Sequence, residues 1–145
     1  MAFFRTILLS LGLFLVGCEA EEKVLFDETP EAAAMNFFNA IYNTRDLNTA
    51  FKLSTPRMQR LLESYAAINN VQRHVINLMY DDVTLTLDTG NVRMRTQYAD
   101  HMRITVILSG MYDGDKIDEV RRVHLVNDRN HWKVDKIDTD GLLGW

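Results

Sequence analysis

The first half of the chain repeats its apolar residues with the period of an α-helix. Thr29-Pro30-Glu31 predicts a helix start, because Thr can cap free N–H groups, Pro suits the first turn and Glu favours the positive end of the helix dipole. Asp46 and Ser54-Thr55-Pro56 predict the starts of a second and a third helix. The apolar face of the first helix would be Ala34, Phe37, Phe38, Ile41 and Tyr42. The inward residues would be Leu47, Ala50, Phe51 and Leu53 in the second helix, and Met58, Leu61, Leu62, Tyr65 and Ile68 in the third.

From Asp82 onward the chain alternates apolar and polar residues, as a half-buried β-strand does. The inward positions would be Val83, Leu85 and Leu87, and later Ile104, Val106 and Leu108. The stretches "IDEVRRVHLV" and "HWKVDKI" predict two more strands, and "DTGN", "YDGD" and "NDRN" predict turns. Residues 71–80, "VQRHVINLMY", fit a helix by their spacing and a strand by their β-branched content, so both readings stay open.

Helices followed by strands predict an α+β fold. We expect about three N-terminal helices packed on one face of a curved antiparallel sheet of four to five strands, in a single domain over residues 29–145. The element order and the stretches "PEAAAMNFFNAI", "RDLNTAFKLSTPRMQRLL" and "VRRVHLVNDRNHWKVDKI" resemble the nuclear-transport-factor-like superfamily, which includes SnoaL-like and ketosteroid-isomerase-like domains. The resemblance covers nearly all of residues 29–140. It implies a cone-like domain with a pocket for a small apolar ligand between sheet and helices. A different α+β sandwich is the alternative.

The N-terminal segment has the pattern of a lipoprotein signal peptide. In residues 1–17, Arg5 precedes an uncharged apolar run, which is typical of secretory signals. Leu15-Val16-Gly17-Cys18 resembles the lipobox of bacterial lipoproteins. This resemblance implies cleavage between Gly17 and Cys18, and acylation of the Cys18 sulfur and of its new amino group. Residues 18–28 would then be the lipidated cysteine and an acidic tether. The alternative is a secreted protein in which Cys18 lies near the cleavage site by chance.

Cys18 is the single cysteine, so an anchoring role leaves the folded domain without disulfides. A catalytic role is disfavoured, because three nearby glutamates oppose the thiolate that a reactive cysteine needs. The lipid would hold the protein at a membrane, outside the cytoplasm. By analogy with Gram-negative sorting, Asp after the cysteine retains a lipoprotein at the inner membrane. Glu19 is not that signal, so the periplasmic face of the outer membrane is favoured over the inner membrane, and a Gram-positive source stays open.

Charge and candidate chemistry exclude some functions. The formal net charge of −4 argues against nucleic acid as a partner. Residues that could line the pocket are Tyr42, Tyr65, Tyr80 and His74, together with Asp135. An isomerase-like site would need a carboxylate base facing a Tyr that stabilises an enolate, and none of these residues matches the catalytic positions of that enzyme family. We expect the tyrosines to be core residues with their hydroxyls at the rim. No catalytic residue and no cofactor is predicted.

The four histidines lack the spacing of metal-binding motifs, so no metal site is predicted. His124 and His131 flank the "NDRN" turn and could be diagonal neighbours that bind a metal or respond to pH, although solvated strand positions are favoured. A basic strip on the exposed sheet face could meet anionic headgroups or an acidic partner, or be only solvated. It would consist of Arg93, Arg95, Arg103, Arg121 and Arg122. The tail "GLLGW" is expected to dock on its own domain, with contact to another protein as the alternative.

Together these features predict a membrane-anchored extracytoplasmic lipoprotein. We interpret its domain as a non-catalytic module of the cell envelope that binds a small apolar ligand or a partner protein. Two alternatives remain, a small ketosteroid-isomerase-like enzyme and an assembly scaffold that forms a homodimer through its sheet. A buried carboxylate facing a Tyr in a closed pocket would favour the enzyme, and an exposed apolar sheet face would favour the scaffold.

Overall fold

The computed structural model describes residues 29–88 and 99–139. The predictions for residues 1–28, which include Gly17, Cys18 and the tether, lie outside the described residues. The same holds for Arg93, Arg95 and the tail "GLLGW". Among the helices of the described part, none combines the length and the apolar character needed to cross a membrane.

Three capped helices begin where the sequence predicts them. Their bounds are α1 Pro30–Tyr42, α2 Leu47–Lys52 and α3 Pro56–Tyr65. The capping side chains are those of Thr29, Asp46 and Thr55, and each accepts a hydrogen bond from a backbone N–H of the first turn. Because the first turn of a helix leaves several N–H groups without a backbone partner, these caps fix where each helix starts.

The stretch that the sequence leaves open forms neither an ordinary α-helix nor a strand. After α3 the chain turns at Ala66, whose φ is 55°, and continues through a short helix, α4 (Ile68–Asn70), into a π-helix, η1 (Val71–Ile76). Gln72 is buried in η1, and its side-chain amide donates to the Ile41 carbonyl at 3.2 Å. This bond holds η1 against the last turn of α1 and satisfies an amide that would otherwise be costly to bury.

In the described part of the chain, four antiparallel strands form one sheet in the order β1-β2-β3-β4. Their bounds are β1 Asp82–Leu87, β2 His101–Tyr112, β3 Asp115–Asp128 and β4 His131–Asp138. The two tight hairpins turn at Asp113-Gly114 and at Arg129-Asn130, and all four residues have positive φ. Such pairs match the right-handed twist of the flanking strands. "YDGD" and "NDRN" are therefore confirmed as turns, whereas "DTGN" runs beyond the described residues.

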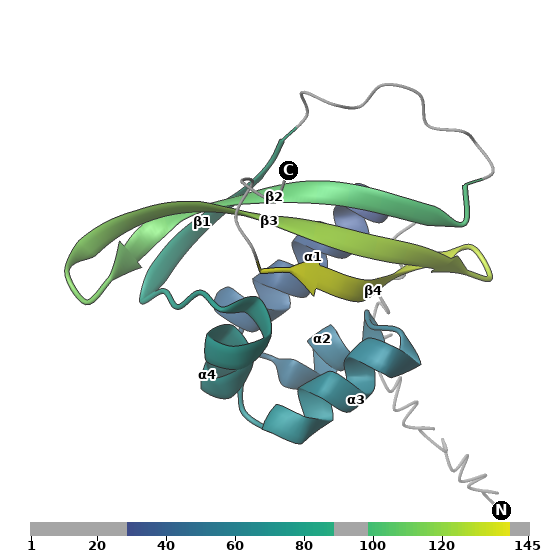
Figure 1. The fold of residues 1–145 in the computed structure, drawn as a ribbon, viewed down its shortest axis with the longest axis horizontal. Coiled ribbons are helices and arrows are strands. Elements are labelled where there is room, and N and C mark those ends of the chain that lie inside the picture. The colour runs from purple at the N-terminus through teal and green to yellow at the C-terminus, as the bar shows by residue number, and fades with distance from the viewer. Residues whose placement is uncertain (1–28, 89–98, 140–145) are drawn as a thin grey trace, which may run out of the picture.

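The helices pack on one face of the sheet, with α2, α3 and α4 together below it in Figure 1. α1 packs against all four strands. The predicted apolar face of α1 is confirmed, since all of its residues are buried. Aromatic rings continue this core from Phe38 through Tyr42 to Tyr80, with centroid separations of 6.3 and 5.7 Å. The α+β class is thus confirmed.

A glycine lies where β2 passes close to β1 and to the Tyr80 ring. Gly110 pairs with Val83, and a Cβ atom at Gly110 would lie 2.0 Å from the Asp82 carbonyl oxygen and 2.9 Å from the Tyr80 ring. The Tyr80 ring occupies the space that a larger residue would need, and its hydroxyl donates to the Leu108 carbonyl at 3.1 Å. Glycine is therefore required by packing at this position.

Arg121 lies in the core, so its predicted place in the exposed basic strip is wrong. It is 4% exposed, because successive residues of a strand point to opposite faces and Arg121 falls on the inner one. Its guanidinium donates to the carbonyls of Ile76 and Asn77 at 2.9 and 3.0 Å. It also donates to the Val120 carbonyl at 2.8 Å and lies 3.4 Å from the Glu119 carboxylate. Arg121 thereby joins β3 to the C-terminal end of η1, where free carbonyls need donors and the helix dipole favours a cation.

Candidate functional site

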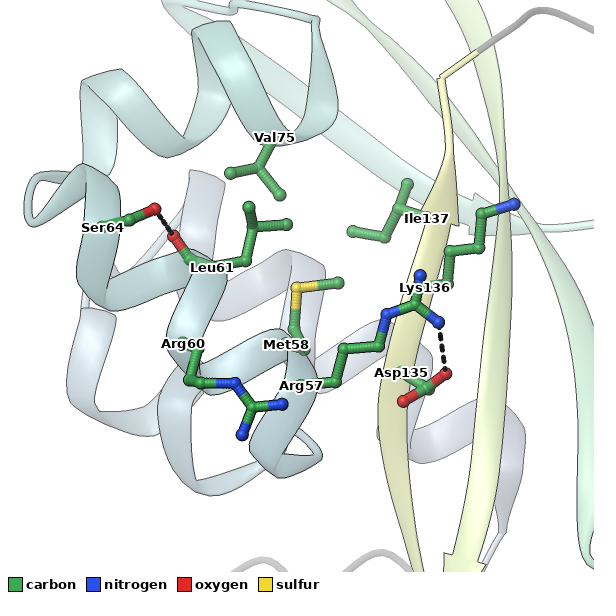
Figure 2. A pocket seen from close by; sticks show the side chains of 9 residues that line it. All are labelled: Arg57, Met58, Arg60, Leu61, Ser64, Val75, Asp135, Lys136 and Ile137. Atoms are coloured by element: carbon green, nitrogen blue, oxygen red, sulfur yellow. Dashed lines mark hydrogen bonds and ion pairs between the residues drawn. The ribbon is translucent and has the colours of Figure 1, made fainter.

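A groove of about 420 Å³ opens between α3, η1 and β4, and Figure 2 shows its side chains. Its floor is apolar and consists of Met58, Leu61, Val75 and Ile137. Its rim consists of Arg57, Arg60, Ser64, Asp135 and Lys136. Leu61 is 40% exposed, so the groove leaves a large apolar side chain open to solvent. Its volume falls within the range of small-molecule sites, roughly 300–1,000 Å³.

Helical spacing places the α3 residues of the groove on one side of that helix. Arg57, Leu61 and Ser64 recur at intervals of four and three residues, so their side chains form one stripe. Leu62 is buried and faces the core. The prediction that Leu61 shares this inward face is wrong, because adjacent residues of a helix lie about 100° apart and the core covers only one side of α3.

A β-bulge in β4 directs Asp135 to the rim of the groove. The register of β3 and β4 shifts between His124 and Leu125, which leaves Asp135 without a residue directly opposite. Its carboxylate accepts a hydrogen bond from the Thr55 hydroxyl at 2.7 Å and lies 3.7 Å from the Arg57 guanidinium. Thr55 also caps α3, so this carboxylate joins β4 to the start of α3 and fixes the spacing of the two walls.

The segment before α3 covers part of the β4 edge. The Val134 N–H donates to the Leu53 carbonyl at 2.8 Å, and the Thr55 N–H donates to the Val134 carbonyl at 2.9 Å. An uncovered edge strand pairs readily with other chains, so this short parallel bridge protects β4. Beyond the bridge, Lys136 and Ile137 line the groove.

A second hollow of about 440 Å³ lies against the outer face of the sheet, which turns away from the helices. We call it the outer hollow. It shares Arg57, Asp135 and Lys136 with the groove and adds His101, Met102, Arg103, His124, Leu125 and Val126. Arg103 lies opposite His124, and His124 lies opposite Lys136, so these side chains form a row across three strands. The groove and the outer hollow therefore meet at the Arg57–Asp135 pair.

Positive charge exceeds negative charge around the two hollows. Asp138 accepts from Lys136 Nζ and lies against His124 Nε2, both at 2.7 Å. The bond from His124, followed by that from Lys136, holds the pKa of the Asp138 carboxyl below its usual value. Arg60 at the groove and Arg103 at the outer hollow have no acidic partner within residues 29–88 and 99–139.

The four candidate pocket residues, Tyr42, Tyr65, Tyr80 and His74, line neither the groove nor the outer hollow. The Tyr42 hydroxyl donates to the Leu78 carbonyl at 2.6 Å, and the Tyr80 hydroxyl donates to two backbone carbonyls at 3.1 and 3.3 Å. Burial raises the pKa of Tyr42 well above its usual value and that of Tyr80 to about 12, so both phenols stay protonated donors. The Tyr65 ring stacks on His74 with centroids 5.2 Å apart.

His124 and His131 are not diagonal neighbours, so that prediction is wrong. The hairpin turns within Arg129-Asn130, which pairs His131 with Asp128 and leaves His124 farther along the ladder, opposite Lys136. The tight turn sets this register. In the part of the chain that the structure describes, no group of three or more His, Cys, Asp or Glu side chains could hold a metal ion.

Sequence reasoning misses the groove because its walls come from three separate segments. No short motif connects Leu61 of α3, Val75 of η1 and Ile137 of β4. One signal was available, since Leu61 lies on a helical stripe with the polar residues Arg57 and Ser64.

No protein-family model, curated protein or solved structure matches the chain.

Proposed function

We propose that this protein is a lipid-anchored lipoprotein of the cell envelope whose domain binds, without catalysis, a small ligand with an apolar body and an anionic end. The groove carries this proposal, because its apolar floor is open to solvent at Leu61 beneath a rim of three cations and one carboxylate. Open apolar surface framed by polar groups is typical of binding sites. A ligand on the floor would remove this surface from water, and its anionic end would meet the arginines.

The predicted N-terminal processing supports a role at the envelope. The lipobox Leu15-Val16-Gly17-Cys18 implies acyl chains on Cys18. Each buried methylene contributes ~0.8 kcal/mol, so one chain holds marginally and two or more hold firmly. Glu19 favours the periplasmic face of the outer membrane over the inner membrane. The acidic tether would keep the domain and its groove near that membrane.

The cone-like, nuclear-transport-factor-like architecture is part of the proposal. The order of helices and strands supports it, as does the packing of the helices on one face of an antiparallel sheet. The hydroxyls of Tyr42 and Tyr80 favour binding over the ketosteroid-isomerase-like alternative, because both donate to backbone carbonyls. The scaffold alternative has less support, because the apolar pair Ile107 and Val120 on the outer face lies beside Thr86 and other polar residues.

Leu61→Gln is expected to weaken the binding of dodecanoate, a probe with an apolar chain and a carboxylate, about tenfold. The substitution removes apolar contact worth on the order of 1.4 kcal/mol from the floor, and that energy corresponds to tenfold in affinity. Because Leu61 is 40% exposed, the fold should tolerate the change. Amide hydrogen exchange in α3 and β4 measures binding to the acylated protein in phosphatidylcholine vesicles.

Met111→Gln is the matched control for this substitution. Within the described residues, Met111 is the other large apolar side chain that is exposed, at 41%, and it lies on β2 outside the groove. The Met111→Gln substitution should leave dodecanoate binding unchanged. Equal affinity of the wild-type and Leu61→Gln proteins for dodecanoate would reject the groove as the binding site.

Cys18→Ala is expected to release the protein from membranes and to abolish its labelling by an alkyne analogue of palmitate. The reason is that the acyl chains on Cys18 would supply the whole anchor. Membrane fractionation and in-gel detection of the label measure both effects. Lys23→Ala, a change in the same tether that spares the cysteine, should keep label and location. Unchanged fractionation of Cys18→Ala would contradict the anchor.

A further inference from the structure

We propose that the ligand of the groove is a single-chain phosphate monoester of the lysophosphatidic acid type, with its acyl chain on the groove floor and its phosphate in the outer hollow. This inference rests on the proposed function and adds the chemical class of the ligand. It is carried by the adjacency of the two hollows, by their charge and by their size.

The two hollows adjoin each other, because Arg57, Asp135 and Lys136 line both of them. The Thr55 hydroxyl donates a hydrogen bond to the Asp135 carboxylate, which holds the boundary between the groove and the outer hollow in place. The backbone bridge that covers the β4 edge is centred on Val134, and the lining residues Lys136 and Ile137 lie beyond it. A ligand can therefore extend from the apolar floor past the β4 edge to the outer face of the sheet.

The charge of the outer hollow suits phosphate. Arg57, Arg103 and Lys136 line it together with two histidines, and Asp135 is the single carboxylate among the described residues that line it. Lys136 and one of the histidines share the Asp138 carboxylate, whereas Arg103 has no acidic partner within the described ranges. A phosphate monoester carries about −1.5 to −2 charge at neutral pH and several acceptor oxygens, so it can engage guanidinium and ammonium groups together. The rim of the groove alone would suffice for a carboxylate.

The groove suits one acyl chain. Its floor consists of four apolar side chains, and its volume of about 420 Å³ lies near the lower end of the range for ligand sites, roughly 300–1,000 Å³. Arg60 lies on the rim of the groove. A lipid with one chain can therefore cover the floor, while its head group reaches the more strongly cationic outer hollow.

Dodecyl phosphate and dodecanoate separate the contribution of the head group from that of the chain. Each is titrated below its micelle concentration into the full acylated protein in phosphatidylcholine vesicles, and amide hydrogen exchange reports the affinity. Arg103 lines only the outer hollow. Arg103→Gln is therefore expected to lower the affinity for dodecyl phosphate about tenfold and the affinity for dodecanoate less than about twofold. Arg129→Gln removes the same charge from a hairpin side chain that is 94% exposed, and it should change neither affinity.

The outcomes distinguish this inference from the proposed function. If Arg103→Gln leaves dodecyl phosphate binding unchanged while Leu61→Gln weakens it, the phosphate site is overturned and the proposed function stands. An equal loss of affinity for dodecyl phosphate and dodecanoate in Arg103→Gln would also overturn the phosphate site. If Leu61→Gln weakens neither ligand, the proposed function itself fails. Inorganic phosphate alone should bind at least about 100-fold more weakly than dodecyl phosphate, because it buries no chain. Equal affinities for inorganic phosphate and dodecyl phosphate would indicate a site for free phosphate and would overturn the inference of a lipid ligand.

Discussion

Arg121→Ala is expected to lower the free energy of unfolding by about 3 kcal/mol, a large part of the stability of a domain of this size. The guanidinium donates to carbonyls at the end of η1 and within β3, and each hydrogen bond from a charged donor contributes ~1.5–3 kcal/mol. Alanine leaves the carbonyls of Ile76 and Asn77 without this donor and opens a cavity beside them. The release of a buried charge offsets part of the loss. Urea denaturation followed by circular dichroism measures the change.

Two further variants separate the causes. Arg121→Met restores much of the volume without donors, so it should recover the packing contribution and leave most of the hydrogen-bond loss. Arg122→Ala is the matched control, because the next residue points to the opposite face and should change stability by about 0.5 kcal/mol or less. Amide hydrogen exchange should show the loss of protection first in η1. Equal stabilities of Arg121→Ala and Arg122→Ala would contradict the role of Arg121 in holding η1.

Gly110→Ala is expected to lower the free energy of unfolding by about 2–3 kcal/mol through overpacking. The added methyl group would lie 2.0 Å from the Asp82 carbonyl oxygen, so the backbone of β1 must move away from β2. The Tyr80 ring, 2.9 Å from the same methyl position, would have to move as well. That movement would strain the hydrogen bond from Tyr80 to Leu108 and the ring contact with Tyr42. Thermal and urea unfolding measure the loss.

The neighbouring Ser109→Ala provides the control. Ser109 pairs with Asp118 across the outer face, where its hydroxyl also bonds the carboxylate. Its replacement adds no atom between β1 and β2, so a loss of about 1 kcal/mol or less is expected. Hydrogen exchange in Gly110→Ala should rise mainly in β1. Unchanged protection of β1 with an unchanged melting temperature would mean that the sheet accepts a side chain at Gly110.

Local signals in the sequence predict much of the helical layer and the sheet. The helix starts are predicted by the capping residues Thr29, Asp46 and Thr55, because capping depends on residues adjacent in sequence. The Asp113-Gly114 turn is equally local, since its backbone conformation favours these residue types. The inward residues of β1 and β2 follow from simple alternation.

The remaining features depend on contacts between distant residues. The charge of Arg121 alone predicts a surface residue, and its burial becomes favourable through its bonds to distant carbonyls at the end of η1 and to its neighbours in β3. The position of Asp135 depends on a register shift relative to β3, which the turn alone does not predict. Leu61 belongs to an apolar stripe, and whether it meets the core or the groove depends on how far β4 lies from α3. The periodicity of the sequence does not determine which of these distant residues meet.

The bond between Thr55 and Asp135 has a consequence for the order of assembly. The two residues are 80 positions apart, and their contact fixes the spacing of the groove walls. Contacts within α1 to α3 join residues close in sequence, so these helices can form before β4 packs against α3. The long loop between the two residues must then close before the walls meet, which is a slow, entropically costly step. The groove is thus among the last parts of the domain to form, and only a chain synthesised through β4 can bind at it.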